Sequence, residues 1–229
     1  MILVLGSCRV CIPLLESKFD CLNTFSRLTG KQYYRIGDVW SINDHYETLQ
    51  LILGRKDTNK YVGIRYQKYK DISENILFIR KNFDKIKMVI MECSSIKYFT
   101  DLEGNLIHNL IHSKINDKCK HKYLKKELSV NEINLYINNI IKILPNKKIC
   151  FVNHFLHSKI PNRLLMNNCY ENFLKTYKKN NLFILTPSDN WTDDNASDWL
   201  SDPNHYHDYV LNKIYIWFDL NISKIYTVL

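Results

Sequence analysis

Apolar residues occur along this chain in short runs that are separated by stretches with a helical period. Runs of four or five apolar residues bounded by polar or turn-forming residues are typical of strands buried on both faces. Their alternation with amphipathic stretches predicts a parallel sheet with crossover helices. The predicted strands are Ile2–Leu5, Met88–Met91, Ile149–Val152, Leu182–Leu185 and Ile225–Leu229.

The stretches with a helical period predict the helices. Ser129 and Glu132 have the spacing of a capping box at the start of one such stretch, and Pro145 follows its end. Both signals mark helix boundaries, so they define this helix best. The predicted helices are Val10–Lys18, His45–Leu53, Ser73–Asn82, Val130–Leu144, Asn162–Lys179 and His205–Phe218.

The length of 229 residues fits a single α/β domain with a core of its own, spanning 1–229. The alternation of strands and helices breaks down in an insertion at about 98–128, where Asp101–Asn105 has the composition of a turn between two short extended pieces. We interpret this insertion as a flap over a site. An irregular surface hairpin is the alternative.

Apolar residues make up 45% of the chain and charged residues 24%, which is ordinary globular usage and argues against disorder. No window approaches the roughly 20 apolar residues of a membrane span. Gly6 and Arg9 interrupt the first apolar run, so the start of the chain does not have the pattern of a signal peptide. We therefore expect a cytoplasmic protein without a membrane span.

The seven cysteines are scattered, and their odd number does not fit a framework of disulfides. Cys93 and Cys150 lie in apolar strand-like runs, where a thiol behaves as a small hydrophobic group. Cys8 and Cys11 form a C-x-x-C pair, but no second pair or suitably spaced histidines complete a zinc site. We expect reduced cysteines and no metal.

The formal net charge of +9 favours an anionic partner. Lysines concentrate between Lys114 and Lys126. Such a run is either a solvated face or a lip that attracts the phosphates of a cofactor or a nucleotide-linked substrate. We do not expect nucleic acid as a partner, because no helix-turn-helix, zinc-finger or RNA-binding aromatic motif is visible.

Polar and reactive residues directly follow four of the predicted strands. In an open parallel sheet, ligands bind beyond the carboxyl ends of the strands, so these residues share one edge. They are Gly6-Ser7-Cys8-Arg9, Glu92-Cys93-Ser94-Ser95, Asn153-His154 and Thr186-Pro187-Ser188-Asp189.

Cys8 and His205 are the candidate nucleophile and base for acyl-group chemistry. At a helix start, the Cys8 thiolate is stabilised by backbone N–H groups and the positive helix end. Asp202, three positions before His205, is placed to orient the imidazole ring. The N–H groups of the Gly6 turn are candidate oxyanion donors, and Arg9 holds an anionic group or forms a surface ion pair.

Each of these residues also has a purely structural interpretation. Cys8 is then a small buried thiol, and Ser7 caps the helix that follows it. Asp202 is an N-cap for the last helix, with Pro203 at the first helical position. His205 is then a surface residue near that helix start, and His154 is a buried polar residue.

Gly6-Ser7-Cys8 near the start and Asp202-x-x-His205 ahead of the last predicted helix together resemble the marks of the SGNH superfamily. The family has Gly-Asp-Ser at the first position, so Ser7 and Cys8 depart from it and are similar to a Gly-Ser-Cys or Gly-Asn-Cys branch. That branch includes acetyltransferase-like proteins of surface-polysaccharide biosynthesis. The resemblance implies a three-layer SGNH or flavodoxin-like α/β sandwich, with a mainly parallel sheet and helices on both faces.

The resemblance also implies further site residues. Gly37 corresponds to the glycine that the family has after its second strand. The asparagine that the family has after its third strand corresponds to Ser94 or, one strand later, to Asn153. With Gly6, Arg9 and His154, these residues are the candidates for binding the substrate or cofactor.

The main functional hypothesis is transfer of an acetyl group from acetyl-coenzyme A to a hydroxyl or amino group of a phosphate-bearing sugar. Ser7, Cys8, Asp202 and His205 would carry the chemistry. A carbohydrate esterase or deacetylase that uses the same residues is the first alternative, and a non-catalytic binding module is the second.

Overall fold

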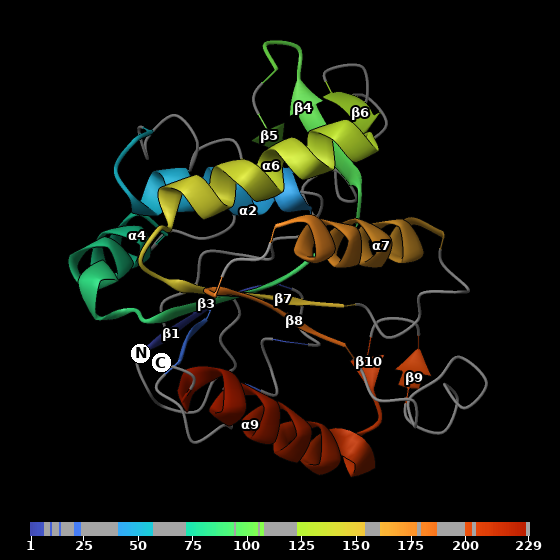
Figure 1. The fold of residues 1–229 in the computed structure, drawn as a ribbon. Helices are drawn as coiled ribbons and strands as arrows, with labels where there is room; N and C mark the ends of the chain where they lie inside the picture. Colours follow the sequence, from blue (N-terminus) through green and yellow to red (C-terminus); the bar gives the residue numbers. More distant parts are fainter. Residues whose placement is uncertain are drawn as a thin grey trace.

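Five parallel strands form the central sheet in the described part of the chain, shown in Figure 1. Their spatial order is β2-β1-β3-β7-β8, and every neighbouring pair is parallel. The strands are β1 (Ile2–Leu5), β2 (Cys21–Asn23), β3 (Met88–Glu92), β7 (Lys148–Val152) and β8 (Leu182–Leu185). The four strands predicted between Ile2 and Leu185 are thus confirmed. The sequence analysis missed β2, which has only three residues and no apolar run.

The structure is a computed structural model, and parts of the chain lie outside its description. The described residues are 1–6, 10, 14, 21–23, 41–56, 72–93, 95–104, 106–107, 123–153, 161–177, 180–186, 200–202 and 205–227. Among these, only the backbone is described for 21–23, 72–75, 107, 123, 161, 200–202 and 205–206.

Helices cover both faces of the sheet, so the predicted three-layer α/β class is confirmed (Figure 1). One face carries α2 (Ile42–Ile52), α4 (Ile72–Lys81), α6 (Val130–Ile143) and α7 (Pro161–Thr176), and a short 3-10 helix, η1 (Phe83–Lys85), follows α4. We call the apolar cluster between these helices and the sheet the upper core. The opposite face carries α9 (Leu211–Thr227), and the cluster beneath it is the lower core.

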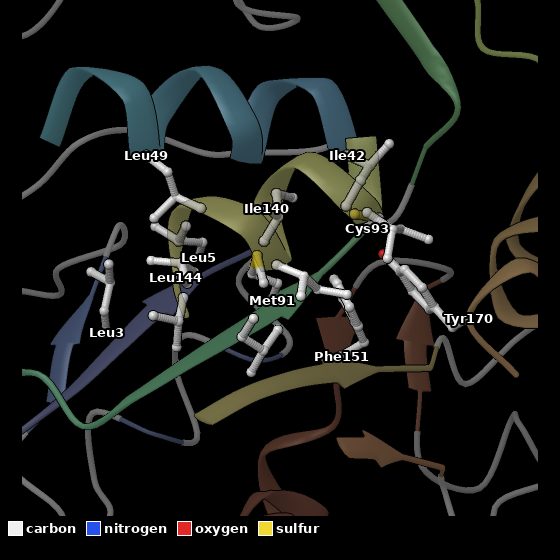
Figure 2. Close-up of a cluster of buried hydrophobic side chains, with 14 of the residues drawn as sticks. Leu3, Leu5, Ile42, Leu49, Met91, Cys93, Ile140, Leu144, Phe151 and Tyr170 are labelled. Atoms are coloured by element: carbon white, nitrogen blue, oxygen red, sulfur yellow. The ribbon is translucent and has the colours of Figure 1, made fainter. Parts of the chain in front are cut away.

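The strands supply both cores because successive side chains point to opposite faces of a sheet. In β1, Leu3 and Leu5 belong to the upper core, whereas Ile2 and Val4 belong to the lower core. Figure 2 shows part of the upper core, where Leu5 and Met91 lie below residues of α2 and α6. Burial on both faces explains why these strands are continuous apolar runs.

The α6 helix begins at the predicted capping box. The Ser129 hydroxyl accepts a hydrogen bond from the Glu132 N–H at 3.3 Å, and the Glu132 carboxylate accepts one from the Ser129 N–H at 2.8 Å. From there, Ile133, Ile137 and Ile140 line the buried face of the helix at helical spacing.

The prediction of a strand at Ile225–Leu229 is wrong, because α9 continues to Thr227. Ile214, Phe218, Ile222 and Ile225 form one buried stripe at helical spacing. A short apolar run fits a strand or a buried helix equally well when it is taken alone, and here the stripe that precedes it decides for the helix.

The predicted start of the last helix at His205 is also wrong. Leu200–Asp202 and His205–Tyr206 form the antiparallel strands β9 and β10, and a 3-10 turn, η4 (Asp208–Val210), leads into α9. The interpretation of Asp202 as the N-cap of this helix therefore fails. The two residues between the strands, Pro203 and Asn204, are of turn-forming types. The backbone N–H and C=O groups of β9 and β10 bond each other across the pair instead of bonding within a helix.

The insertion forms a small antiparallel sheet with the order β5-β4-β6 in its described residues. Its strands are β4 (Lys97–Asp101), β5 (Leu106–Ile107) and β6 (Tyr123–Glu127), and the predicted turn links the first two. Gly104, with φ +87°, adopts the left-handed conformation that this turn requires.

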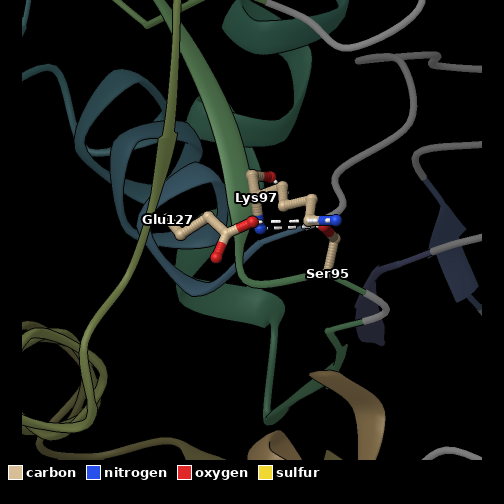
Figure 3. A network of polar contacts seen from close by, with 3 residues as sticks. All are labelled: Ser95, Lys97 and Glu127. Carbon is tan, nitrogen blue, oxygen red and sulfur yellow. Dashed lines mark hydrogen bonds and ion pairs between the residues drawn. The ribbon is translucent and has the colours of Figure 1, made fainter. Parts of the chain in front are cut away.

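A polar network fixes the start of β4 (Figure 3). The Ser95 hydroxyl accepts the Lys97 N–H at 2.9 Å, and the Lys97 ammonium lies 3.6 Å from the Glu127 carboxylate on the paired strand β6. Both charged side chains are well exposed, so this ion pair adds little stability.

Candidate functional site

The carboxyl ends of the parallel strands meet at one edge of the sheet. Gly6, Cys93, Asn153 and Thr186 are the first residues beyond β1, β3, β7 and β8. In the sheet, β2 lies on one side of β1 and β3 lies on the other. The direction in which successive strands are added therefore reverses between β1 and β3. Ligands of doubly wound sheets bind at such a switch point. The candidate site therefore lies beyond Gly6 and Glu92.

Gly6 permits a close approach of β1 and β3 at this point. A Cβ atom on residue 6 would lie 3.2 Å from the Glu92 Cβ and 3.5 Å from the Glu92 backbone nitrogen. Glu92 is 2% exposed and ends the central strand β3, so it has little room to move. An alanine at this position would therefore need Glu92 to shift slightly at the switch point.

We expect Gly6→Ala to destabilise the fold by about 1–3 kcal/mol, the usual cost of overpacking, and to lower turnover at this edge. Gly54→Ala is the matched control. Gly54 lies just beyond the C-terminal end of α2 and has φ +71°. Alanine there costs about 1–2 kcal/mol because a residue with a side chain disfavours this left-handed backbone conformation. Denaturant unfolding and turnover per folded molecule separate the two variants. Equal turnover in both would contradict a role for the Gly6 turn in the site.

His45 connects α2 to this edge of the sheet, although the sequence pattern predicts it only as the first residue of a helix. The His45 Nε2 atom lies 2.9 Å from the Glu92 carbonyl oxygen, and both groups are buried. Because a carbonyl oxygen only accepts, Nε2 carries the proton in this contact. His45 thus holds the first turns of α2 against the last residue of β3, and no periodicity signal marks such a contact in advance.

The two ends of the chain meet in the lower core. Val10 and Leu14 are helical and fully buried there, together with Val210 and Ile214 from the start of the last helical segment. Of the predicted helix Val10–Lys18, only these two residues are described. Cys8 precedes Val10 by two positions, and His205 precedes Val210 by five. Both candidate catalytic residues are therefore close in sequence to residues of one apolar cluster.

The direction of α9 brings its first residues to the carboxyl edge of the sheet. The Lys148 ammonium, at the start of β7, donates to the carbonyl oxygens of Ile225 and Tyr226 at 2.8 and 3.0 Å. The end of α9 therefore lies at the amino edge, and the helix runs antiparallel to the strands. In Figure 1, β9 and β10 lie on the side of the sheet toward which β7 and β8 run.

Asp202 and His205 are Cα partners in the β9–β10 ladder. Directly paired residues in antiparallel strands have adjacent side chains. This pairing is compatible with an imidazole and carboxylate that work together. The side chains of both residues lie outside the described structure.

Cys93 is buried beside Tyr170 in the upper core (Figure 2). Burial raises the pKa of the Cys93 thiol well above its usual value; contact with the Tyr170 hydroxyl lowers it, and the charges of Glu92 and Asp44 raise it further. Burial also raises the pKa of Cys150. Both thiols therefore remain protonated at neutral pH, and neither is a competing nucleophile. The prediction that they behave as small hydrophobic groups is confirmed.

Asn153 is 1% exposed, and its amide nitrogen donates to the Glu171 carboxylate and the Thr186 hydroxyl, both at 3.1 Å. Both N–H groups of the amide are thus engaged, and these bonds join β7 and α7 to Thr186, directly after β8. A role for this side chain as an oxyanion donor would require those bonds to break.

Several predicted site residues lie outside the described structure, so their roles stay predictions. They are Ser7, Cys8, Arg9, Gly37, Ser94 and His154. Among the residues whose placement is described, no cluster of histidine, cysteine or acidic side chains has the makeup of a metal site. The described helices include none that is long and apolar enough to cross a membrane.

Comparison with known proteins gives weak likenesses only. No family model and no curated protein matches the sequence. A carbohydrate esterase family 3 structure from Talaromyces cellulolyticus aligns over 100% of this chain and 99% of its own, with 12% identity and a TM-score of 0.46. An acetyl xylan esterase, Est2A, from the rumen bacterium Butyrivibrio proteoclasticus aligns over 97% of this chain and 64% of its own, with 10% identity and a TM-score of 0.38. The fold class therefore rests on the strand order and layers described above.

Proposed function

We propose that this chain hydrolyses acyl esters of carbohydrates, with Cys8 as nucleophile and His205 as base. The observation that supports this proposal is that Val10 and Val210, which follow Cys8 by two positions and His205 by five, belong to one apolar cluster, the lower core. The choice of a carbohydrate follows the resemblance of the Gly6-Ser7-Cys8 and Asp202-x-x-His205 segments to SGNH proteins.

In the first half of the proposed reaction, His205 takes the Cys8 thiol proton and the thiolate attacks the ester carbonyl carbon. Backbone N–H groups of the turn after Gly6 donate to the oxyanion that forms. The intermediate collapses to an acyl-Cys8 thioester, and the sugar oxygen leaves with the proton held by His205. Asp202 orients the imidazole and stabilises its charged form.

In the second half, His205 takes a proton from water, and the hydroxide attacks the acyl-Cys8 carbonyl. The thiolate leaves and regains its proton from His205, which releases the free acid. Hydrolysis needs only water as its second substrate, so it is the simplest reaction for this set of residues.

Acetyl transfer from acetyl-coenzyme A to a sugar is the second candidate. It is favoured by the net charge of +9 and by the exposed Lys125 and Lys126 on β6, which suit phosphate-bearing substrates. The same acyl-Cys8 intermediate would then pass its acetyl group to a sugar hydroxyl or amine.

Two parallel assays on the purified protein test the proposal. In the first, the substrates are acetylated xylo-oligosaccharides and the released acetate is measured. In the second, the substrates are acetyl-coenzyme A and nucleotide-linked sugars, and the released free thiol is measured. We expect saturable acetate release that depends on His205. Thiol release that requires the acceptor sugar, without ester hydrolysis, would replace the first proposal by the second. Turnover in neither assay would contradict both.

A further inference from the structure

Two buried polar atoms at the carboxyl edge have no hydrogen-bond partner among the described residues. They are the Asn153 Oδ1 atom and the Tyr170 hydroxyl oxygen, and each residue is 1% exposed. Buried polar groups in native proteins are nearly always paired, so an unpaired one indicates strain, a bound water or a function. Here two such atoms come from neighbouring elements, β7 and α7.

The hydrogen bonds of Asn153 fix which way its amide faces. An ionised carboxylate only accepts, so the atom 3.1 Å from the Glu171 carboxylate is the nitrogen Nδ2. The same nitrogen donates to Thr186, which uses its second proton. The backbone N–H of Asn153 is bonded to the Leu185 carbonyl at 2.8 Å. Asn153 is therefore held rigidly with an acceptor, Oδ1, left over.

Tyr170 lies on the same side of β7 as this acceptor, because its neighbour Glu171 bonds Asn153 and its own ring stacks on Phe151. Glu92 and Val152 are partners in the β3–β7 ladder, so Cys93 and Asn153 occupy matching positions one residue later. The Tyr170 ring stacks on Phe151 with centroids 4.4 Å apart, and its hydroxyl lies at Cys93 (Figure 2). The hydroxyl proton is directed at the Cys93 sulfur, which is a weak acceptor, and the Tyr170 oxygen has no stronger partner among the described residues. Burial raises the Tyr170 pKa, which keeps the hydroxyl protonated as a donor.

We propose that Asn153 Oδ1 and the Tyr170 hydroxyl form a subsite for one hydroxyl group. The bound hydroxyl donates its proton to Asn153 Oδ1 and accepts the proton of Tyr170, which satisfies both buried atoms with one oxygen. This assigns Asn153 the role of an acceptor toward a ligand, in contrast to the oxyanion donor or cofactor contact that its sequence position predicts.

The hydroxyl has two possible sources, an ordered water and a sugar hydroxyl of the substrate. The second source rests on the proposed carbohydrate esterase. It would make the subsite a determinant of specificity, because a site built to hydrogen-bond a hydroxyl discriminates strongly against ligands that lack one.

The test compares Tyr170→Phe with the parent protein on two esters, an acetylated xylo-oligosaccharide and 4-nitrophenyl acetate, which carries no sugar hydroxyl. If the substrate supplies the hydroxyl, the ratio of kcat/KM for the sugar ester to that for 4-nitrophenyl acetate falls roughly 10- to 100-fold in the variant. Thr48→Val is the control, because it removes another buried hydroxyl without a partner, on α2, and should leave the ratio unchanged.

A crystal structure of the parent protein at high resolution gives a readout that does not depend on turnover. If the ratio stays constant and an ordered water lies within hydrogen-bond distance of both Asn153 Oδ1 and the Tyr170 oxygen, the subsite is real and its occupant is water. If the parent protein hydrolyses neither ester, the proposed function fails, and the crystal structure alone decides on the subsite. An unchanged ratio, or an inactive parent, with no oxygen bonded to both atoms overturns the inference.

Discussion

Cys8→Ala is expected to lower kcat for acetyl-ester hydrolysis by at least about 10³-fold, because removal of a nucleophile leaves only oxyanion stabilisation and substrate binding. We expect the variant to fold normally, with a thermal midpoint within about 2 °C of the parent protein, because the proposal gives Cys8 a catalytic role, and replacing a residue that has no packing role changes stability little. Turnover of 4-nitrophenyl acetate and thermal unfolding followed by circular dichroism measure the two quantities.

Cys150→Ala is the matched control for this variant. Cys150 is fully buried in β7, and burial raises the pKa of its thiol, so it plays no part in nucleophilic attack. Its replacement should cost stability and leave turnover per folded molecule unchanged. The opposite pattern, in which Cys8→Ala loses stability but keeps its rate, would show that Cys8 is a structural thiol.

Chemical labelling separates the proposed nucleophile from the other thiols independently of any substrate. A thiolate reacts with iodoacetamide and a thiol does not, so a cysteine with a lowered pKa reacts first. Cys93 and Cys150 are buried with raised pKa values and should stay unmodified in the folded protein. We expect mass spectrometry to find the first modification on Cys8, and loss of activity to follow it.

Most of the central sheet could be predicted from sequence because its strands are buried on both faces. Leu3 and Leu5 face one core and Ile2 and Val4 the other, so β1 is apolar at every position. Such a run also fits a buried helix, which is why the pattern predicts a strand at Ile225 although this residue continues the stripe of α9. The ladder of β9 and β10 was missed because two short strands and a turn carry little periodicity.

The location of the candidate site could be predicted more readily than its contacts. Gly6 and Asn153 follow strands, so the rule for parallel sheets places them at one edge without any coordinates. The bond from His45 to the Glu92 carbonyl joins residues 47 positions apart, and no local pattern encodes it. The direction in which the Asn153 amide faces depends on Glu171 and Thr186, which only the packed structure brings together.

The lower core, which contains Val10 and Val210 near the Cys8 and His205 segments in sequence, depends on the packing of α9 against the sheet. Phe218 is 0% exposed at the middle of the buried stripe of α9, and its ring packs edge-on against Trp217 with centroids 4.9 Å apart. Removal of a buried aromatic ring loses its transfer free energy and leaves a cavity in the core. Ile216, two positions earlier, is 53% exposed on the same helix.

We therefore expect Phe218→Ala to lower the free energy of unfolding by about 3–5 kcal/mol, and the thermal midpoint by roughly 6–20 °C, whereas Ile216→Ala changes the free energy by about 0.5 kcal/mol or less. Urea unfolding followed by tryptophan fluorescence measures both variants, with Trp217 next to the altered position. Because α9 tethers the His205 segment, esterase activity of Phe218→Ala should disappear at the temperature where the fold melts. A cost below about 1 kcal/mol for Phe218→Ala would mean that α9 does not cover this face of the sheet. The convergence of the two chain ends, and with it the proposed function, would then lose its support.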